Sequence, residues 1–321
     1  MAAAWPSDTR GMYLKRAFRF LVLIGCAAVV MAVARPCRAQ QQITMAGLKV
    51  AVWLPTEKAT GADWPVIIFS HGFHGSNIQS TFLMKALADA GYAVFAPNHA
   101  DAGLGRWKPV VPFASAGQWT DATYADRRRD IEKLIAALKA NPRFGSKPYD
   151  WDRLGLAGHS LGGYTVLGLA GAWPSWTDNR IKAVLALSPY SAPFIMKKTL
   201  GSLHVPVMYQ GGTLDFAITP SLRKANGAYD QTPPPKFYIE LKGAGHLAWT
   251  DLRPAYHSTI VGYSIAFFDH FLKRKPLPNQ FAAKNHNIAT FRRMDSPTTM
   301  PLTSRFPNWP LSDRWFAAVE R

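Results

Sequence analysis

A serine in a glycine-rich motif is the residue best suited to nucleophilic chemistry in this sequence. The motif is Gly-His-Ser-Leu-Gly-Gly at residues 158–163, with Ser160 at its centre. The apolar run 154–157 before it predicts a buried strand, and the small and apolar residues 164–170 after it predict a helix. A sharp turn between strand and helix lifts the serine hydroxyl above the end of a sheet. Ser160 can therefore act as a nucleophile if a base and a site for negative charge lie beside it.

An aspartate and a histidine follow two later strand patterns, each in a glycine-rich turn. Asp215 ends the segment Gly-Gly-Thr-Leu-Asp, and His246 ends the segment Gly-Ala-Gly-His. The chain order Ser, Asp, His is that of an α/β-hydrolase triad. In that triad the histidine takes the serine proton and returns it to the leaving group, while the aspartate orients the imidazole. Asp178 and Asp251 are the alternatives for the acid, but neither directly follows a strand together with glycines.

Two of the turns also offer backbone N–H groups to a negatively charged oxygen. Acyl transfer creates such an oxyanion, which needs preorganised donors. We expect the N–H of Leu161 to be one donor and the N–H of Phe73, in the loop 70–75, to be the second. His71 and His74 in this loop suggest a metal site, but no carboxylate accompanies them. We therefore expect both to be structural, and we expect neither a metal nor a cofactor.

Alternating strand and helix patterns must position these turns. After an opening strand region, the alternation predicts an α/β fold with a mostly parallel central sheet and helices on both faces. Because the carboxyl ends of parallel strands meet at one edge, the turns that follow them can converge there. Residues 43–54 are expected to form one or two opening strands at a sheet edge. The further expected strands are 65–69, 92–96, 154–157, 181–187, 205–209 and, as the last, 237–241, and the longest expected helices lie at 82–90, 127–138 and 260–272.

The chain is strongly basic, with a net charge of +17 over 321 residues. A basic surface can serve nucleic acids, acidic polymers or membrane surfaces. No basic helix or aromatic–basic stripe of the kind that binds nucleic acids is present in the sequence. The run Arg127-Arg128-Arg129 opens a helix and is expected to form a solvated face. We therefore expect no nucleic-acid partner.

The N-terminus predicts a secretory signal peptide. A basic stretch at 15–19 precedes an apolar run at 20–34, and a small residue, Ala39, ends the segment. The apolar run is shorter than the roughly 20 residues that span a membrane. We expect cleavage after Ala39, export to the periplasm or the exterior, and no stable membrane insertion afterwards. An uncleaved anchor is the alternative.

The remaining chain is expected to form one catalytic domain over 40–272, with residues 273–321 as an extended tail packed on it. Both cysteines lie in the signal segment, at positions 26 and 37, so the mature chain would contain no disulfide. The long irregular stretch 99–123 is expected to be a pocket wall or lid, with a packed surface loop as the alternative.

Taken together, these loops resemble the α/β-hydrolase superfamily, in particular dienelactone-hydrolase-like, platelet-activating-factor-acetylhydrolase-like and polyester-hydrolase-like esterases. The resemblance covers roughly residues 45–272, and it rests on the motif 158–163 together with His-Gly-Phe at 71–73. Dienelactone hydrolases proper use a cysteine nucleophile, so the serine here favours ordinary esters. The resemblance implies a triad of Ser160, Asp215 and His246 and oxyanion donors at Phe73 and Leu161.

Aromatic residues near these turns are candidates for the substrate pocket. In polyester-hydrolase-like enzymes an aromatic residue after the strand that follows the nucleophile helix lines the cleft, and Tyr190 occupies the matching place. Phe73, Phe216 and Trp249 are further candidates for the pocket wall.

The sequence thus predicts an exported serine esterase that acts through an acyl-enzyme. Its substrate would be a small-molecule ester or, as a wider alternative, a polymeric ester. A peptidase or amidase of the same fold is the main alternative, because a triad does not distinguish esters from amides. A cofactor-free perhydrolase and a non-catalytic binding protein on a hydrolase fold are the others.

Overall fold

A ten-stranded mixed sheet forms the centre of the computed structural model, which describes residues 40–55, 63–103, 109–141, 143–144, 147–281 and 285–295. The strand order is β1-β2-β4-β3-β6-β7-β8-β9-β10, with β5 beside β6. The strands from β4 to β9 along this order are parallel, whereas β1, β2 and β10 are antiparallel additions at the two edges. The strands are β1 (Gln41–Met45), β2 (Leu48–Trp53), β3 (Trp64–Ser70), β4 (Ala93–Pro97), β5 (Arg143–Phe144), β6 (Lys147–His159), β7 (Ile181–Leu187), β8 (Val207–Gly212), β9 (Lys236–Leu241) and β10 (Ile288–Met294).

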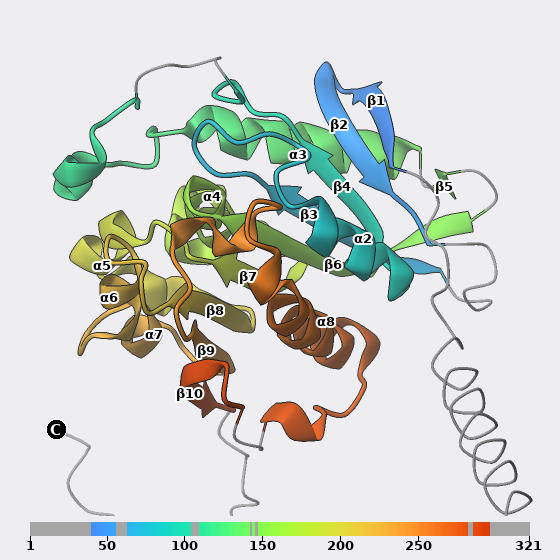
Figure 1. The fold of residues 1–321 in the computed structure, drawn as a ribbon. Helices are drawn as coiled ribbons and strands as arrows, with labels where there is room; N and C mark the ends of the chain where they lie inside the picture. The colour runs from blue at the N-terminus through green and yellow to red at the C-terminus, as the bar shows by residue number, and fades with distance from the viewer. Residues whose placement is uncertain are drawn as a thin grey trace, which may run out of the picture.

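Helices cover both faces of the sheet, as predicted (Figure 1). Helices α2 and α8 share one buried apolar cluster with the sheet, and α3 to α7 share the other. Figure 1 shows α8 crossing the first face and α3 the second. The helices are α2 (Thr81–Asp89), α3 (Ala125–Ala140), α4 (Leu161–Leu167), α5 (Ala192–Lys197), α6 (Thr219–Arg223), α7 (Ala228–Gln231) and α8 (His257–Lys273).

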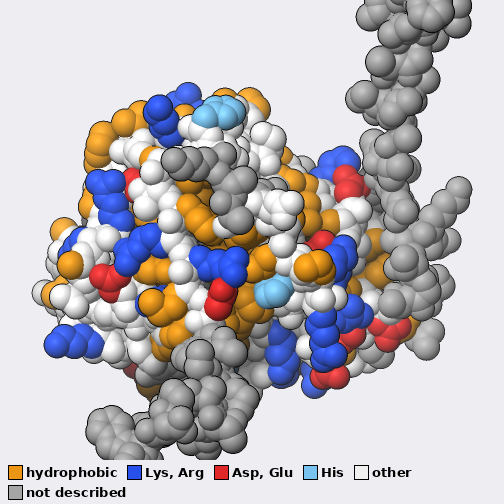
Figure 2. Space-filling view, turned by 90° about the horizontal axis from the view of Figure 1, so that it is seen from below, with side chains coloured by type: hydrophobic (Ala, Val, Ile, Leu, Met, Phe, Trp, Pro, Cys, Tyr) orange, Lys and Arg blue, Asp and Glu red, His pale blue; other side chains and the backbone are white. Residues whose placement is uncertain are grey.

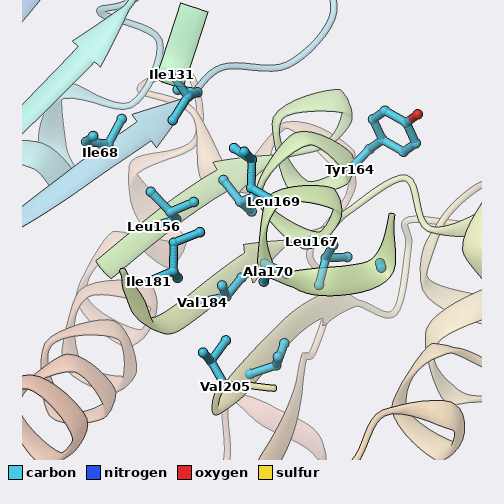
Figure 3. Packing of buried hydrophobic residues seen from close by; sticks show 14 of the residues in the cluster. Ile68, Ile131, Leu156, Tyr164, Leu167, Leu169, Ala170, Ile181, Val184 and Val205 are labelled. Atoms are coloured by element: carbon cyan, nitrogen blue, oxygen red, sulfur yellow. The ribbon is translucent and has the colours of Figure 1, made fainter. Parts of the chain in front are cut away.

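The continuous apolar run of β3 is explained by burial on both faces of this strand. Val66 and Ile68 belong to the cluster under α3, and Ile67 and Phe69 belong to the cluster under α2 and α8. Successive side chains of a strand point to opposite faces, so a strand covered twice has no polar position. Figure 3 shows part of the cluster under α3 to α7, where Ile68 lies with side chains of neighbouring strands and helices.

The prediction that 237–241 is the last strand is wrong, because β10 pairs with β9 in antiparallel register. Ile288 and Phe291 of β10 pack, partly buried, against the cluster under α8. The segment after α8 therefore contributes a strand to the sheet. The predicted signal peptide at 1–39 and most of the predicted tail lie outside the described residues. Within the described ranges, no helix is both long and apolar enough to cross a membrane.

The expected solvated face at 127–129 is wrong for its first residue. Arg127 of α3 is fully buried and forms an ion pair with Asp101, which is also fully buried. Asp101 lies in the irregular stretch after β4, where the sequence has no periodic pattern that predicts a helix or a strand. Arg128 is half-buried and Arg129 exposed, as a solvated face requires. Figure 2 shows lysine and arginine side chains spread among acidic and apolar ones on the face seen from below, rather than gathered in one stripe.

Candidate active site

The turn around Ser160 is a tight elbow between β6 and α4. Ser160 has φ 54° and ψ −115°, a left-handed backbone conformation that side chains rarely adopt. A Cβ on Gly158 would lie 2.3 Å from the carbonyl oxygen of Gly162, and a Cβ on Gly162 would lie 1.9 Å from that of Ser70. These distances leave room only for glycine at both positions. The strained turn presents the Ser160 hydroxyl at the carboxyl edge of the sheet, where the sequence predicted it.

The structure brings the three predicted triad side chains together. Nε2 of His246 lies 3.0 Å from Oγ of Ser160, and Nδ1 lies 3.1 Å from Oδ2 of Asp215. Asp215 follows β8 and is buried, whereas the His246 side chain, after β9, is 36% exposed. Because an ionised carboxylate can only accept, the proton of the neutral imidazole is on Nδ1, and Nε2 can accept from the serine hydroxyl. This geometry allows His246 to take a proton from Ser160 while Asp215 stabilises the imidazolium.

The two alternative acids are engaged elsewhere. Asp178 accepts hydrogen bonds of 2.7 and 2.5 Å from the Arg180 guanidinium. Burial acts to raise the pKa of Asp178, but the bonds from Arg180 outweigh burial and lower it. Asp251 accepts from the backbone N–H groups of Thr81 and Phe82 at the start of α2. Neither carboxylate is hydrogen-bonded to His246.

The loop after β3 packs directly against the elbow. A Cβ on Gly72 would lie only 3.3 Å from Cβ of Ser160. Phe73, the next residue, lies on the wall of the same cleft as Ser160, and Leu161 is the first residue of α4. The two backbone positions expected to donate to an oxyanion thus adjoin the nucleophile from two sides.

An open cleft of about 500 Å³ leads to Ser160 and His246. Three exposed apolar side chains border it, with exposed fractions of 45% for Ile78, 46% for Leu247 and 71% for Leu252. The cleft therefore offers apolar contact next to the nucleophile together with free access from solvent.

Comparison with known proteins assigns the chain to a family. The family model of PET hydrolase-like proteins matches residues 131–299, which is more than half of the chain. The chain belongs to the PET hydrolase-like family. A second model, platelet-activating factor acetylhydrolase, isoform II, matches residues 25–105. The predicted resemblance to these esterase families and the predicted α/β-hydrolase fold are both confirmed.

Curated relatives of this PET hydrolase-like chain include several cutinases. Cutinase 1 of Thermobifida cellulosilytica is 33% identical over 238 residues, which cover 72% of this chain and 76% of the relative. Cutinase 2 of the same organism is 34% identical over 135 residues, covering 41% of this chain and 46% of the relative. Dipeptidyl-peptidase 5 of Porphyromonas gingivalis is 27% identical over 158 residues, covering 47% of this chain and 21% of the relative. The chain thus spans less than half the length of the last two relatives.

The predicted pocket residues occupy different environments in this family member. Phe73 lines the cleft, but Trp249 is fully buried and donates its indole N–H to Gln210 in the core, so the prediction that it lines the pocket is wrong. Phe216 is 75% exposed and lies outside the cleft lining. Tyr190 is largely buried, and its backbone N–H donates to the carbonyl oxygen of Ser160. Its backbone therefore adjoins the nucleophile, but its ring lies outside the cleft lining in which the sequence placed it.

Part of the irregular stretch 99–123 explains the burial of the Tyr190 ring. Trp119 is fully buried with its ring centroid 4.8 Å from that of Tyr190, and the Tyr190 hydroxyl donates to the carbonyl oxygen of Phe113. Trp119 and Phe113 thus pack the described part of this stretch against Tyr190, while much of the rest is exposed, and within the described part only Gly103 reaches the cleft. Residues 104–108, which include Trp107, lie outside the described residues.

Ser188 is a site residue that the sequence analysis missed. Its hydroxyl donates to Oδ2 of Asp215, and Oγ of Ser188 also lies 3.0 Å from Nδ1 of His246. Ser188 directly follows β7, so it lies at the carboxyl edge of the sheet, like the residues that were predicted. That placement was the available signal. Ser188 thus contacts both His246, which would take the serine proton, and Asp215, which would stabilise the resulting imidazolium.

His159 and Gln79 connect the two loops that flank the elbow. His159 donates from Nε2 to the carbonyl oxygen of His246 and accepts at Nδ1 from the amide of Gln79. Gln79 in turn accepts from the backbone N–H of Gly72. Burial, followed by the nearby His246, lowers the pKa of His159 to about 3. His159 therefore stays neutral and holds the His246 turn in place.

His71 and His74, in the loop after β3, are the residues for which the sequence suggested a metal site. His71 is fully buried, and its ring nitrogens contact backbone groups of Gly72 and His99. Within the part of the chain that the structure describes, no three His, Cys, Asp or Glu side chains are grouped to hold a metal ion.

Proposed function

We propose that this PET hydrolase-like chain is a carboxylic ester hydrolase that acts through an acyl-enzyme. The hydrogen-bonded chain from Ser160 through His246 to Asp215, open to the cleft, carries this proposal. The names of the cutinase relatives support ester hydrolysis over other reactions of the fold.

In the first half-reaction, Oγ of Ser160 attacks the ester carbonyl carbon, and its proton moves to Nε2 of His246. The carbonyl oxygen becomes an oxyanion, which would accept from the N–H groups of Phe73 and Leu161. Collapse of this intermediate breaks the bond to the alcohol oxygen, which leaves with the proton of His246. Water then repeats these steps on the acyl-enzyme and releases the carboxylic acid and free Ser160.

The substrate proposed here is a small ester or an accessible ester group of a polymer. The open cleft and its exposed Ile78, Leu247 and Leu252 support an apolar acyl or alcohol part that need not be enclosed. We propose further that the chain is exported after cleavage at Ala39, because the N-terminal segment has the composition of a signal peptide. The mass of the protein recovered outside the cytoplasm tests this cleavage.

A series of p-nitrophenyl esters of increasing acyl length tests the function, with wild-type protein beside Ser160→Ala. We expect turnover in the wild type and none above background in the variant, with folding unchanged. A phosphonate that labels reactive serines should modify Ser160 alone, as measured by peptide mass. Wild-type protein without ester turnover and without labelling would refute the proposal and favour a non-catalytic binding protein.

A peptidase or amidase is the second candidate, and the match to a dipeptidyl-peptidase favours it. The discriminating assay compares a p-nitrophenyl ester with the anilide of the same acyl group. An ester-to-anilide rate ratio larger than the ratio of their uncatalysed hydrolysis rates supports an esterase. Comparable cleavage of the anilide would make an amidase the better description.

A further inference from the structure

The guanidinium of Arg127 is buried, and its hydrogen bonds to Asp101 fix its position. Nε and Nη2 donate to the two carboxylate oxygens of Asp101 at 3.0 and 2.8 Å. Both side chains are completely shielded from solvent. Burial acts to raise the pKa of Asp101, but the charge of Arg127 outweighs burial and lowers it. The pair is therefore ionised, and Asp101 fixes the plane of the guanidinium through two parallel bonds.

The opposite edge of the guanidinium donates to the loop that carries Phe73. Nη1 donates to the carbonyl oxygen of His71 at 2.7 Å, and Nη2 donates to that of Gly72 at 3.2 Å. The carbonyl of Gly72 and the N–H of Phe73 belong to one peptide group, which is planar with the two bonds in opposite directions. A contact that fixes the Gly72 oxygen therefore also fixes the direction of the Phe73 N–H.

Neighbouring bonds hold the same peptide group in the same orientation. The backbone N–H of His99 donates to Nε2 of His71 at 3.0 Å, so Nε2 is the unprotonated nitrogen. Nδ1 of His71 then carries the proton and donates to the Gly72 oxygen at 2.7 Å. The N–H of Gly75 donates to this oxygen as well, at 3.0 Å. Among these donors, Arg127 alone brings a full positive charge.

We propose that Arg127, fixed by Asp101, is a positioning residue for the oxyanion hole that orients and polarises the Gly72–Phe73 peptide. This inference rests on the proposed function, because it needs an oxyanion opposite the Phe73 N–H. A cation at the carbonyl end withdraws electron density along the peptide group, which makes its N–H a stronger donor. The buried pair thus increases stabilisation of the transition state from behind the loop, without contact with substrate.

The test must separate this role from a contribution to folding. Replacing a buried ion pair by apolar side chains of similar size is often neutral for stability, whereas removal of one partner leaves an unpaired charge. The main variant is therefore the double substitution Arg127→Met with Asp101→Leu. Arg127→Lys keeps the charge but loses the planar group that reaches both carbonyls. Arg128→Met, one residue along the same helix, is the matched control.

The measurements are kcat and KM for a p-nitrophenyl ester and the inhibition constant of a trifluoromethyl ketone. Ser160 would add to that ketone to form a hemiketal whose oxygen occupies the oxyanion hole. For the double variant we expect kcat to fall about 10- to 100-fold, less than the roughly 100- to 1000-fold loss on removal of a donor. KM should stay within about twofold, and the inhibition constant should rise by the same factor as kcat/KM falls. Arg127→Lys should be intermediate, and Arg128→Met should match the wild type.

A folded double variant with wild-type kcat and inhibition constant would overturn the inference. If the double variant does not fold, an unchanged kcat in Arg127→Lys would overturn it equally. A loss of kcat in which the ketone still binds as in the wild type would also refute it, because the oxyanion hole would then be intact. Failure of the proposed function is a separate outcome, since it would show as absent ester turnover in the wild type.

Discussion

The stability of this protein should fall steeply as the pH is lowered from 6 to 5. Three buried histidines, His71, His99 and His159, have pKa values below the ordinary range, because burial disfavours their charged form. In the unfolded chain each takes up a proton near pH 6.5. The unfolded state then binds more protons than the folded state, so acid favours unfolding.

The size of the effect follows from counting protons. Each histidine that is protonated only on unfolding contributes about 1.4 kcal/mol per pH unit below its unfolded pKa. Asp130 acts in the opposite direction, because burial, followed by Asp126, raises its folded pKa to about 6. His159, with a folded pKa of about 3, alone accounts for a loss of about 1.4 kcal/mol over the pH unit from 6 to 5. His71 and His99 add to this loss, and Asp130, which contacts His99, offsets part of it.

Urea unfolding followed by tryptophan fluorescence at pH 7, 6 and 5 measures this slope. His159→Asn keeps an acceptor near the Gln79 amide but cannot be protonated, so the slope should fall by about 1.4 kcal/mol per pH unit. His204→Asn is the control, since His204 is exposed and its replacement should leave the slope unchanged. A free energy of unfolding that changes by less than about 0.5 kcal/mol between pH 6 and 5 would refute the proton count. An unchanged slope in His159→Asn would refute the assignment of His159.

Two further predictions concern the acid of the proposed triad. Asp215→Asn should lower kcat by about 10⁴-fold, because an amide favours the wrong tautomer of His246. Asp178→Asn, the control, should leave kcat within about twofold. Equal losses of kcat in an ester assay would contradict the choice of Asp215. Ser188→Ala removes a donor from the Asp215 carboxylate, which should cost about 1.5–3 kcal/mol in urea unfolding.

The sequence was informative wherever a residue's environment depends on its own strand or turn. Ser160 directly follows β6, and Asp215 and His246 lie in the short turns after β8 and β9. Parallel strands bring such turns to one edge of the sheet. The burial of β3 on both faces was equally predictable from the sequence, because every position of its apolar run is covered by helices. At the triad turns and in β3, the local sequence pattern therefore predicts the position in the folded protein correctly.

Three of the errors share one physical cause, which is a partner distant in sequence. Arg127 looked solvent-exposed because its counter-charge, Asp101, lies in a stretch without periodicity. Trp249 looked like a pocket wall because its hydrogen-bond acceptor, Gln210, lies on a buried strand. The pairing of β10 was hidden because a single strand after a closing helix carries no alternation with which to identify it.

The arrangement of the sheet edges has a consequence for aggregation. The strands that carry the proposed catalytic turns lie inside the sheet, and β1 and β10 form its edges. An open edge strand can pair with a strand of a second molecule, and charged side chains on a short edge oppose this. In β10, Arg292 is paired with Asp230 and Arg293 with Asp295, so ion pairs accompany the exposed edge. The charged side chains of β10 thus oppose intermolecular β-pairing at that edge of the sheet.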